Sequence, residues 1–193
     1  MKPLRLLLTL ASLALCACST VSVTNEWKDP AWSGPPASSV VVVGISKSDL
    51  IRRKFEDTFS QQLLAAGLKA VPSYTQIPPG NGGAVKLTDL VRSSGAEVVL
   101  VTRMLRVEQK IDVTPTGPAY GGFYGWYGGA WASTAQVTQY DVVTLETSVW
   151  DAKTQKLVWS VTTEAVSQEK IAKATEELAQ ALIPKLRTDG ILR

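Results

Sequence analysis

The two thiols of this 193-residue chain, Cys16 and Cys18, are its only cysteines and the residues best suited to covalent chemistry. They close an N-terminal segment in which two basic residues precede an apolar run of ten, Leu6 to Leu15 (LLLTLASLAL). A positive start, a short apolar run and small residues before a cleavage point are the anatomy of a secretory signal peptide. The run is about half the ~20 residues that a membrane-spanning helix needs. The sequence therefore predicts a signal peptide at residues 1–17.

Leu15-Cys16-Ala17-Cys18 resembles the lipobox of bacterial lipoproteins, with Cys18 as the lipidated residue. Cys16 is the alternative, but it would place the bulky Leu15 directly before the cleavage point. The resemblance implies a diacylglyceryl group and an N-acyl chain, such as palmitate, on Cys18, and these chains would hold the protein on a membrane. Ser19 follows, which in this family implies the periplasmic face of the outer membrane. A plain signal peptide without lipid remains the alternative.

The residue types that are missing restrict the chemistry. The chain has no histidine, which excludes Cys/His metal sites, Ser-His-Asp triads and Cys-His nucleophiles. Once Cys18 carries lipid, no disulfide can form within the mature chain. The carboxylates are expected on solvated helix and sheet faces, with no two of them nominated as a glycosidase-like acid pair; they are Glu56, Asp57, Glu146, Glu164, Glu176 and Glu177. We therefore expect no catalytic residue, no metal, no cofactor and no enzyme, with a hydrolase that uses Ser, Lys or carboxylates as a remote alternative.

Charge and short motifs add little. Without residues 1–17, 18 basic residues face 17 acidic ones, so no electrostatic footprint for nucleic acid is present. The loop from Gly44 to Ser48 could bind a small anion at a helix N-terminus, but ordinary capping by Ser48 is the favoured interpretation. Ser167-Gln168-Glu169-Lys170 spells S-x-x-K without the S-D-N and K-T-G partners that such enzymes need.

The most unusual stretch is rich in glycine and aromatic residues, PTGPAYGGFYGWYGGAW from Pro115 to Trp131. Trp and Tyr combine an apolar body with a polar group, which suits membrane interfaces and partner surfaces. A loop near 20 residues without secondary structure is usually functional or disordered. The candidate contacts with a partner or membrane are Tyr120, Phe123, Tyr124, Trp126, Tyr127 and Trp131. Contact with a glycan is a further alternative, and aromatic rings that only fold back over their own sheet are the other interpretation.

Hydrophobic periodicity predicts five strands and three helices. The expected strands are residues 40–45, 68–74, 97–113, 135–150 and a returning strand from Leu157. The expected helices are residues 48–66, a shorter one that stops at Gly95, and one that starts at Ser167. The first helix would bury the stripe Ile51, Phe55, Phe59 and Leu63. A three-residue loop, 153–155, would place Val149 opposite Trp159 and keep the apolar face together.

These elements predict a single three-layer α/β domain. Its mixed five-stranded sheet would have the order 2-1-3-4-5, with only the fourth strand antiparallel and helices on the faces. Residues 18–37 would be a lipidated tether of about 25 Å. Val21 and Val23 alternate with polar residues, so a short added strand within it is the alternative. Residues 38–193 would form the domain, with a long hairpin whose tip spans 115–133.

The element order resembles the anticodon-binding-like arrangement of the N-terminal domain of the periplasmic protein TolB and of CsgG-type and peptidoglycan-synthase-activator lipoproteins. A further resemblance is to an uncharacterised family of proteobacterial outer-membrane lipoproteins, which has no activity to carry over. The segments that carry it include Trp27-Lys28-Asp29-Pro30, Arg52-Arg53-Lys54-Phe55-Glu56-Asp57 and Val71-Pro72-Ser73-Tyr74. Further on it rests on Val143-Thr144-Leu145-Glu146-Thr147 and Leu157-Val158-Trp159-Ser160.

Together these observations favour a non-catalytic outer-membrane lipoprotein that binds a periplasmic protein or acts as an envelope-assembly adaptor. The alternative is a subunit of a homo-oligomeric, CsgG-like secretion or pore assembly. The expected partners are the outer membrane, through lipid on Cys18, and an envelope protein or a second copy of the chain.

Overall fold

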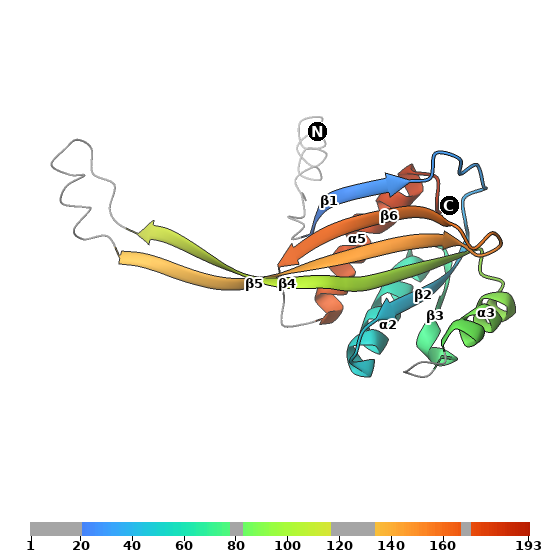
Figure 1. Cartoon of the computed structure of the whole chain (residues 1–193), viewed down its shortest axis with the longest axis horizontal. Coiled ribbons are helices and arrows are strands. Elements are labelled where there is room, and N and C mark those ends of the chain that lie inside the picture. Colours follow the sequence, from blue (N-terminus) through green and yellow to red (C-terminus); the bar gives the residue numbers. More distant parts are fainter. Residues whose placement is uncertain (1–20, 78–82, 117–133, 167–170) are drawn as a thin grey trace, which may run out of the picture.

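The computed structural model describes residues 21–77, 83–116, 134–166 and 171–193 (Figure 1). One mixed sheet organises this part of the chain, in the order β1-β6-β5-β4-β2-β3. Its strands are β1 (Val21–Lys28), β2 (Ser39–Ile45), β3 (Lys69–Pro72), β4 (Val98–Thr116), β5 (Thr134–Asp151) and β6 (Leu157–Val166). β2 pairs in parallel with β3 and β4, whereas the other three pairs are antiparallel. The predicted α/β class and mixed sheet are confirmed.

The sheet has six strands and not the predicted five, because Val21–Lys28 joins it as the edge strand β1. This segment belongs to the stretch 18–37 for which the sequence predicts a tether. Its apolar alternation is limited to Val21 and Val23, so its side chains give little strand signal, and the open edge of β6 supplies the backbone partners. An ion pair of 2.7 Å between Lys185 Nζ and Glu26 Oε2 ties β1 to the last helix. The other five strands keep the predicted neighbours.

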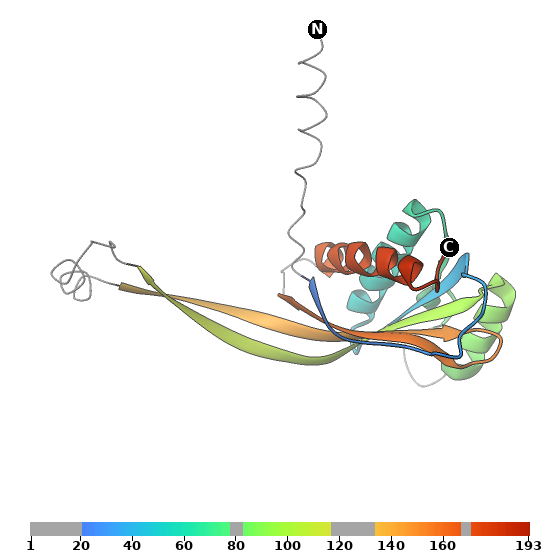
Figure 2. The same ribbon diagram turned by 90° about the horizontal axis from the view of Figure 1, so that it is seen from above.

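Three α-helices of the described residues cover the two faces of the sheet (Figure 2). Helices α2 (Asp49–Ala65) and α5 (Ile171–Thr188) lie on one face, and α3 (Gly83–Ser94) lies on the other. A short 3₁₀ turn, η2 (Ser73–Thr75), follows β3. Among the described residues, no helix combines the length and apolar character needed to cross a membrane.

Each face of the sheet has its own hydrophobic core. The larger core, under α2 and α5, contains the fully buried Phe59, Trp159 and Leu182. The smaller core, under α3, centres on Val41 and Leu90. Neighbouring valines of β2 thus face opposite cores, which explains the continuous apolar run at its centre.

The start of α2 follows the sequence, and its inner face does so in part, since Phe59 and Leu63 are fully buried and Phe55 packs against the larger core. The Ser48 hydroxyl accepts the Ile51 N–H at 3.4 Å, so the predicted N-cap is confirmed. Ile51, however, is 38% exposed and does not belong to the buried stripe. The buried residues of α2 are Arg52, Glu56, Phe59, Ser60 and Leu63. The buried face of α2 thus includes the Arg52–Glu56 pair, joined by an ion pair of 2.9 Å, and leaves out Ile51.

The hairpin between β5 and β6 has the predicted register, with Val149 opposite Trp159 and Leu145 opposite Thr163. Gln155 closes its turn with a φ of 58°, in the left-handed region that favours glycine.

Candidate functional site

The β4–β5 hairpin continues far beyond the body of the domain (Figure 1). β4 pairs with β2 only as far as Arg103, and β5 pairs with β6 only from Val142 onward. The β4–β5 pairing itself continues to Thr116 and Thr134. Residues 109–116 and 134–141 therefore form a two-stranded segment with both edges unpaired among the described residues. At its root, residues 104–108 of β4 have a free edge, whereas the β5 residues opposite them still pair with β6. We name residues 104–116 and 134–141 together the projecting ribbon.

The projecting ribbon exposes apolar side chains along one face. β4 carries a bulge between Met104 and Arg106, where Leu105 is the extra residue. The bulge shifts the alternation of β4 by one place, so that Val107 and Ile111 lie on the same face as Met104. The exposed large apolar side chains of the ribbon are Met104 (54%), Leu105 (46%), Val107 (52%), Ile111 (64%) and Val137 (62%). Exposed apolar residues gathered on one element are typical of a contact surface.

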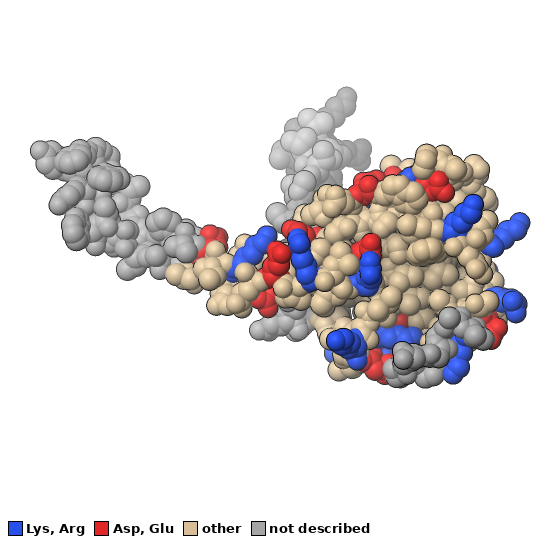
Figure 3. Space-filling model, viewed as in Figure 1, with Lys and Arg blue, Asp and Glu red and all other residues tan. Residues whose placement is uncertain are grey.

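Acidic and basic side chains gather on the opposite face, where the ribbon joins the body (Figure 3). Arg103 pairs with Glu146 across the two strands. Arg106 lies 3.2 Å from Glu108 and 3.5 Å from Glu164, and its Nε also donates to the Thr144 hydroxyl. These pairs are largely solvated, so they contribute little stability, but they fix which face of the ribbon is polar.

The predicted site residues lie outside the described residues. This holds for the lipidation residue Cys18 and for the candidate contacts Tyr120, Phe123, Tyr124, Trp126, Tyr127 and Trp131, as well as for the S-x-x-K segment at 167–170. All of these remain predictions. The projecting ribbon is the element that joins the aromatic stretch to the body.

A buried carboxylate network that the sequence does not predict lies at the carboxyl ends of β2 and β3. Glu56 is fully buried, which corrects its predicted place on a solvated face. Its Oε1 accepts the Gly44 N–H and the Arg52 Nε–H, both at 2.9 Å, and the Ser73 hydroxyl at 2.8 Å. Its Oε2 accepts the Tyr74 N–H at 2.8 Å. The network joins two segments that the sequence singles out as motifs, Arg52–Asp57 and Val71–Tyr74.

The same network bears on whether the loop from Gly44 to Ser48 is an anion site or an ordinary helix cap. A predicted alternative for this loop is an anion site at a helix N-terminus. Here the carboxylate of Glu56 already accepts the Gly44 N–H, and Ser48 caps the helix. The geometry agrees with the favoured interpretation of ordinary capping.

Tyr74 closes the outer side of the network. Its hydroxyl donates to Asp57 Oδ1 at 2.7 Å, and the Arg53 guanidinium lies 5.0 Å from the centre of its ring. The hydrogen bond to Asp57 raises the pKa of the Tyr74 hydroxyl above its ordinary value. Arg53 pairs with Asp49 at 2.7 Å. The Glu56 carboxylate and the hydroxyl groups of Ser73 and Tyr74 are thus all engaged in hydrogen bonds within the fold.

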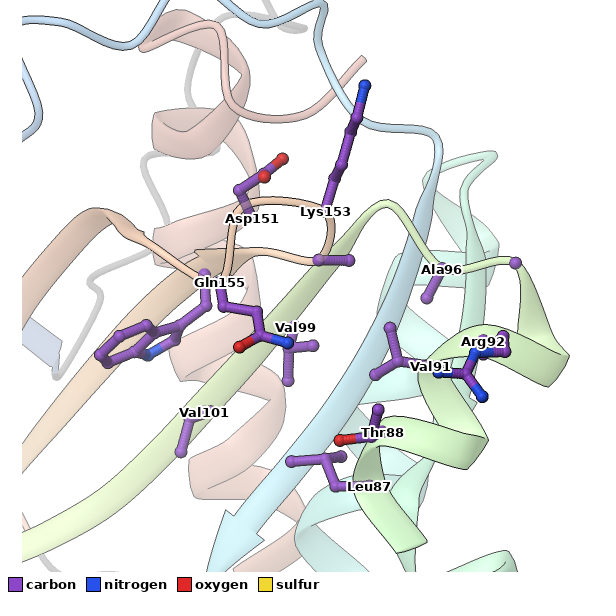
Figure 4. A pocket seen from close by; sticks show the side chains of 13 residues that line it. Leu87, Thr88, Val91, Arg92, Ala96, Val99, Val101, Asp151, Lys153 and Gln155 are labelled. Atoms are coloured by element: carbon purple, nitrogen blue, oxygen red, sulfur yellow. The ribbon is translucent and has the colours of Figure 1, made fainter. Parts of the chain in front are cut away.

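A shallow groove of about 710 Å³ lies between α3 and the β5–β6 turn (Figure 4). Val99 and Val101 of β4 and Val91 of α3 give it an apolar lining (Figure 4), and Trp150 of β5 also lines it. Its one lining carboxylate, Asp151, is bound by the turn itself, since it accepts the N–H and the hydroxyl of Thr154. The groove therefore lacks converging groups for acid–base or nucleophilic chemistry. Within the described ranges, no group of three or more acidic side chains is arranged to hold a metal ion.

The model of the family DUF4136, described as a domain of unknown function, matches residues 88–186, which run from α3 into α5. No curated protein matches the chain by sequence. A solved structure of a PelC dodecamer from Paraburkholderia phytofirmans is 19% identical, with a TM-score of 0.47, and the match covers 90% of this chain and 99% of that one. For lipoprotein GNA1162 from Neisseria meningitidis the identity is 14%, the TM-score 0.43, and the coverage 78% and 99%.

The family match agrees with the predicted resemblance to a family that has no assigned activity. The predicted resemblance to TolB and CsgG-type domains is not supported. Because the TM-scores lie below 0.5, the function of this chain is inferred from its own residues.

Proposed function

We propose, from the premise that this chain belongs to the DUF4136 family of domains of unknown function, that it is a non-catalytic lipoprotein of the outer membrane. Its domain would lie on the periplasmic side and bind another protein of the envelope through the projecting ribbon. The observation that carries this proposal is the ribbon itself, whose outer part has two unpaired edges among the described residues and whose one face carries several exposed apolar side chains.

The ribbon is poorly stabilised in isolation. A two-stranded hairpin is at best marginally stable in water, and at least three strands or a covering helix are normally needed. Unpaired strand edges are also ready templates for a strand of another chain. A partner that adds a strand to an edge would supply backbone hydrogen bonds, while Val107, Ile111 and Val137 would supply apolar contact. One partner would therefore both stabilise the ribbon and pair its free edge.

A non-catalytic role is supported by the residues present. The sequence contains no histidine, and the Glu56 carboxylate accepts its hydrogen bonds from groups of the fold itself. The described groove offers no pair of groups placed for catalysis. Binding is the activity that the exposed surfaces favour.

The lipid anchor is proposed from the segment Leu15-Cys16-Ala17-Cys18. Radiolabelled palmitate supplied to growing cells should be incorporated into the protein, and the Cys18→Ser variant should carry no label. Cys16→Ser serves as the matched control and should keep the label. Equal labelling of the Cys18→Ser protein would remove the anchor from this proposal.

Photo-crosslinking in cells tests the binding surface. A photoreactive phenylalanine analogue at Ile111 or Val137 should give a discrete adduct with an envelope protein. The same analogue at Gln180, exposed on α5, is the control and should not. The ribbon would be rejected as the binding surface if positions 111 and 137 gave no adduct beyond that of the control.

A second copy of the chain is the alternative partner. One observation favours it: each ribbon has two free edges, so the β4 edge of one copy can pair with the β5 edge of the next. In the crosslinking experiment, an adduct of twice the protomer mass would identify this homo-oligomeric assembly.

A further inference from the structure

The described fold shortens the chain that would connect the lipid to the domain. β1 begins at Val21, which pairs with Ala165 of β6. Only Ser19 and Thr20 then separate Cys18 from the sheet. Since an extended chain spans at most about 3.3–3.6 Å per residue, a lipid on Cys18 would lie within about 10 Å of the start of β1. This is less than half the ~25 Å predicted for a tether of residues 18–37.

The start of β1 lies at the end of the body from which the ribbon projects (Figure 1). The pairing places Val21, Ala165, Val143 and Val107 in one row across four strands. Val107 belongs to the first part of the ribbon. The attachment point of the anchor and the root of the ribbon therefore share one end of the domain.

This end also carries exposed apolar side chains from outside the ribbon. β2 and β4 are parallel and both point toward it, and Ile45 pairs with Arg103, next to the ribbon. Ile45 is 58% exposed, and Leu50, in the first turn of α2, is 62% exposed. We name these side chains, together with those at the ribbon root, the apolar end: Ile45, Leu50, Ile51, Met104 and Leu105. Single exposed apolar residues are ordinary, but a group at one end indicates a contact.

We propose that the apolar end of the domain rests on the lipid surface of the membrane that holds the anchor. The inference rests on the lipid at Cys18 proposed above. The short connection brings this end to the headgroups, and apolar side chains at that level enter the boundary between headgroups and acyl chains. Lys47 in the β2–α2 loop adds a cation that anionic headgroups attract.

The position of the ribbon follows from this placement. It extends nine residues beyond Val107, to Thr116, which is about 30 Å at ~3.3 Å per residue. That length is about three times the reach of the connection from Cys18. Because the ribbon leaves the domain from the end that rests on the membrane, the protein that it binds is one held at the membrane rather than one deep in the periplasm.

The mature lipoprotein is well suited to a labelling test, because the sequence has no cysteine after Cys18 and the thiol of Cys18 would carry lipid. A new cysteine at Ser46, in the β2–α2 loop, reports on the apolar end, and one at Lys153, in the β5–β6 turn, reports on the opposite end. Each is labelled with an environment-sensitive fluorophore, and the full lipoprotein is reconstituted in phosphatidylethanolamine–phosphatidylglycerol vesicles that contain headgroup quenchers. We expect quenching at position 46 to exceed that at position 153 several-fold.

Two exposed leucines of α2 give a matched pair of variants. Leu50 lies in its first turn and Leu64, 54% exposed, in its last. Leu50→Glu should reduce the quenching at position 46 to that at position 153, while Leu64→Glu should leave it unchanged. Two further measurements, flotation with the vesicles and the intact mass of the protein, show independently of the quenching whether the protein carries its lipid anchor. Equal quenching at positions 46 and 153 on an anchored protein would overturn the inference alone, whereas a protein without lipid that does not float would overturn the anchor as well.

Discussion

At the scale of single residues, the core contains a hydroxyl group without a hydrogen-bond partner in the described part of the chain. Thr163 of β6 is fully buried, and its Oγ1 has none. Thr147 of β5, also fully buried, shares a hydrogen bond of 2.9 Å with Thr102 Oγ1. Burying a hydroxyl without a partner costs about 1–3 kcal/mol on scales from protein variants. The two threonines therefore make a natural comparison.

We expect Thr163→Val to raise the free energy of unfolding by about 1 kcal/mol, because valine has nearly the same shape and no unsatisfied polar group. Thr147→Val should lower it by about 1–3 kcal/mol, because it leaves the Thr102 hydroxyl buried and unpaired. Urea unfolding measures both. A loss of stability in Thr163→Val would mean that its hydroxyl has a partner, such as a buried water molecule.

The hydrogen bonds of Glu56 hold the carboxyl end of β2 and the residues that follow β3 together. Glu56→Gln replaces a carboxylate that accepts four hydrogen bonds by an amide, and leaves the Arg52 charge buried without its counter-ion. Breaking a buried pair from one side costs about 3–5 kcal/mol. We therefore expect a loss of about 3 kcal/mol in urea unfolding. Asp89→Asn, which changes a largely exposed pair on α3, should cost less than about 0.5 kcal/mol; an equal loss in both variants would contradict this account.

The network of Glu56 also shows what the sequence leaves out at this scale. Helical periodicity counts apolar residues, so a charged pair on the inner face of α2 is read as solvated. The groups that satisfy it, the N–H groups of Gly44 and Tyr74 and the hydroxyl of Ser73, come from separate segments and meet only in the fold. By contrast, the cap at Ser48 depends on residues three apart, and the sequence predicts it correctly.

At the scale of elements, Glu97 joins the starts of β2 and β4. Its Oε2 accepts the N–H of Ser38 at 2.5 Å, the Ser38 hydroxyl at 3.2 Å and the N–H of Ser39 at 3.3 Å. The bond from the Ser38 N–H in particular lowers the pKa of the Glu97 carboxyl below its ordinary value. A carboxyl with a lowered pKa in the folded state adds stability above its unfolded pKa and loses it as the pH falls through the folded one.

Glu97→Gln should therefore lower the free energy of unfolding at pH 7. The difference from the wild-type protein should shrink as the pH falls from about 6 to about 3, because protonation removes the same contribution from the wild type. Urea unfolding at a series of pH values measures it. Glu176→Gln, exposed on α5, is the control and should show no such trend. A difference that stayed constant down to pH 3 would mean that the carboxylate charge contributes nothing at this junction.

The elements differ in how far the sequence predicts them. The apolar run of β2 and the register of the β5–β6 hairpin follow from patterns within one segment or across one turn, and the structure agrees with both. The sequence gives a much weaker signal for β1, because seven of its eight residues are exposed and its place depends on backbone pairing with β6 and on contacts with residues 185–189. Gln155 occupies a left-handed position where glycine is the usual residue, so residue type alone did not define that turn.

At the scale of the whole molecule, the described residues form a body with two cores and a ribbon that projects from it. The sequence predicts the long hairpin, since β4 and β5 alternate over most of their length. It does not predict where the hairpin leaves the body, because that point depends on where β2 and β6 stop pairing. The candidate contacts at 120–131 lie beyond the ribbon and outside the described residues, so they stay predictions.

The body should fold without the ribbon. The buried residues of both cores lie outside residues 110–140. We expect replacement of residues 110–140 by Asn-Gly, a pair suited to a two-residue hairpin turn, to change the free energy of unfolding by less than about 1 kcal/mol. Val149→Ala, in the larger core, should in contrast cost about 2 kcal/mol or more, because it leaves a cavity.

Urea unfolding followed by tryptophan fluorescence compares the shortened protein, Val149→Ala and the wild type. If the shortened protein keeps its stability, the apolar residues of the ribbon beyond Gln109 contribute nothing to the body, and their exposure is explained by contact with another molecule. That protein should also give no partner adduct in cells when the crosslinker is placed at Val107, while it keeps its lipid. A loss of several kcal/mol would instead make the ribbon part of the folding unit, and its apolar face would no longer support a binding role.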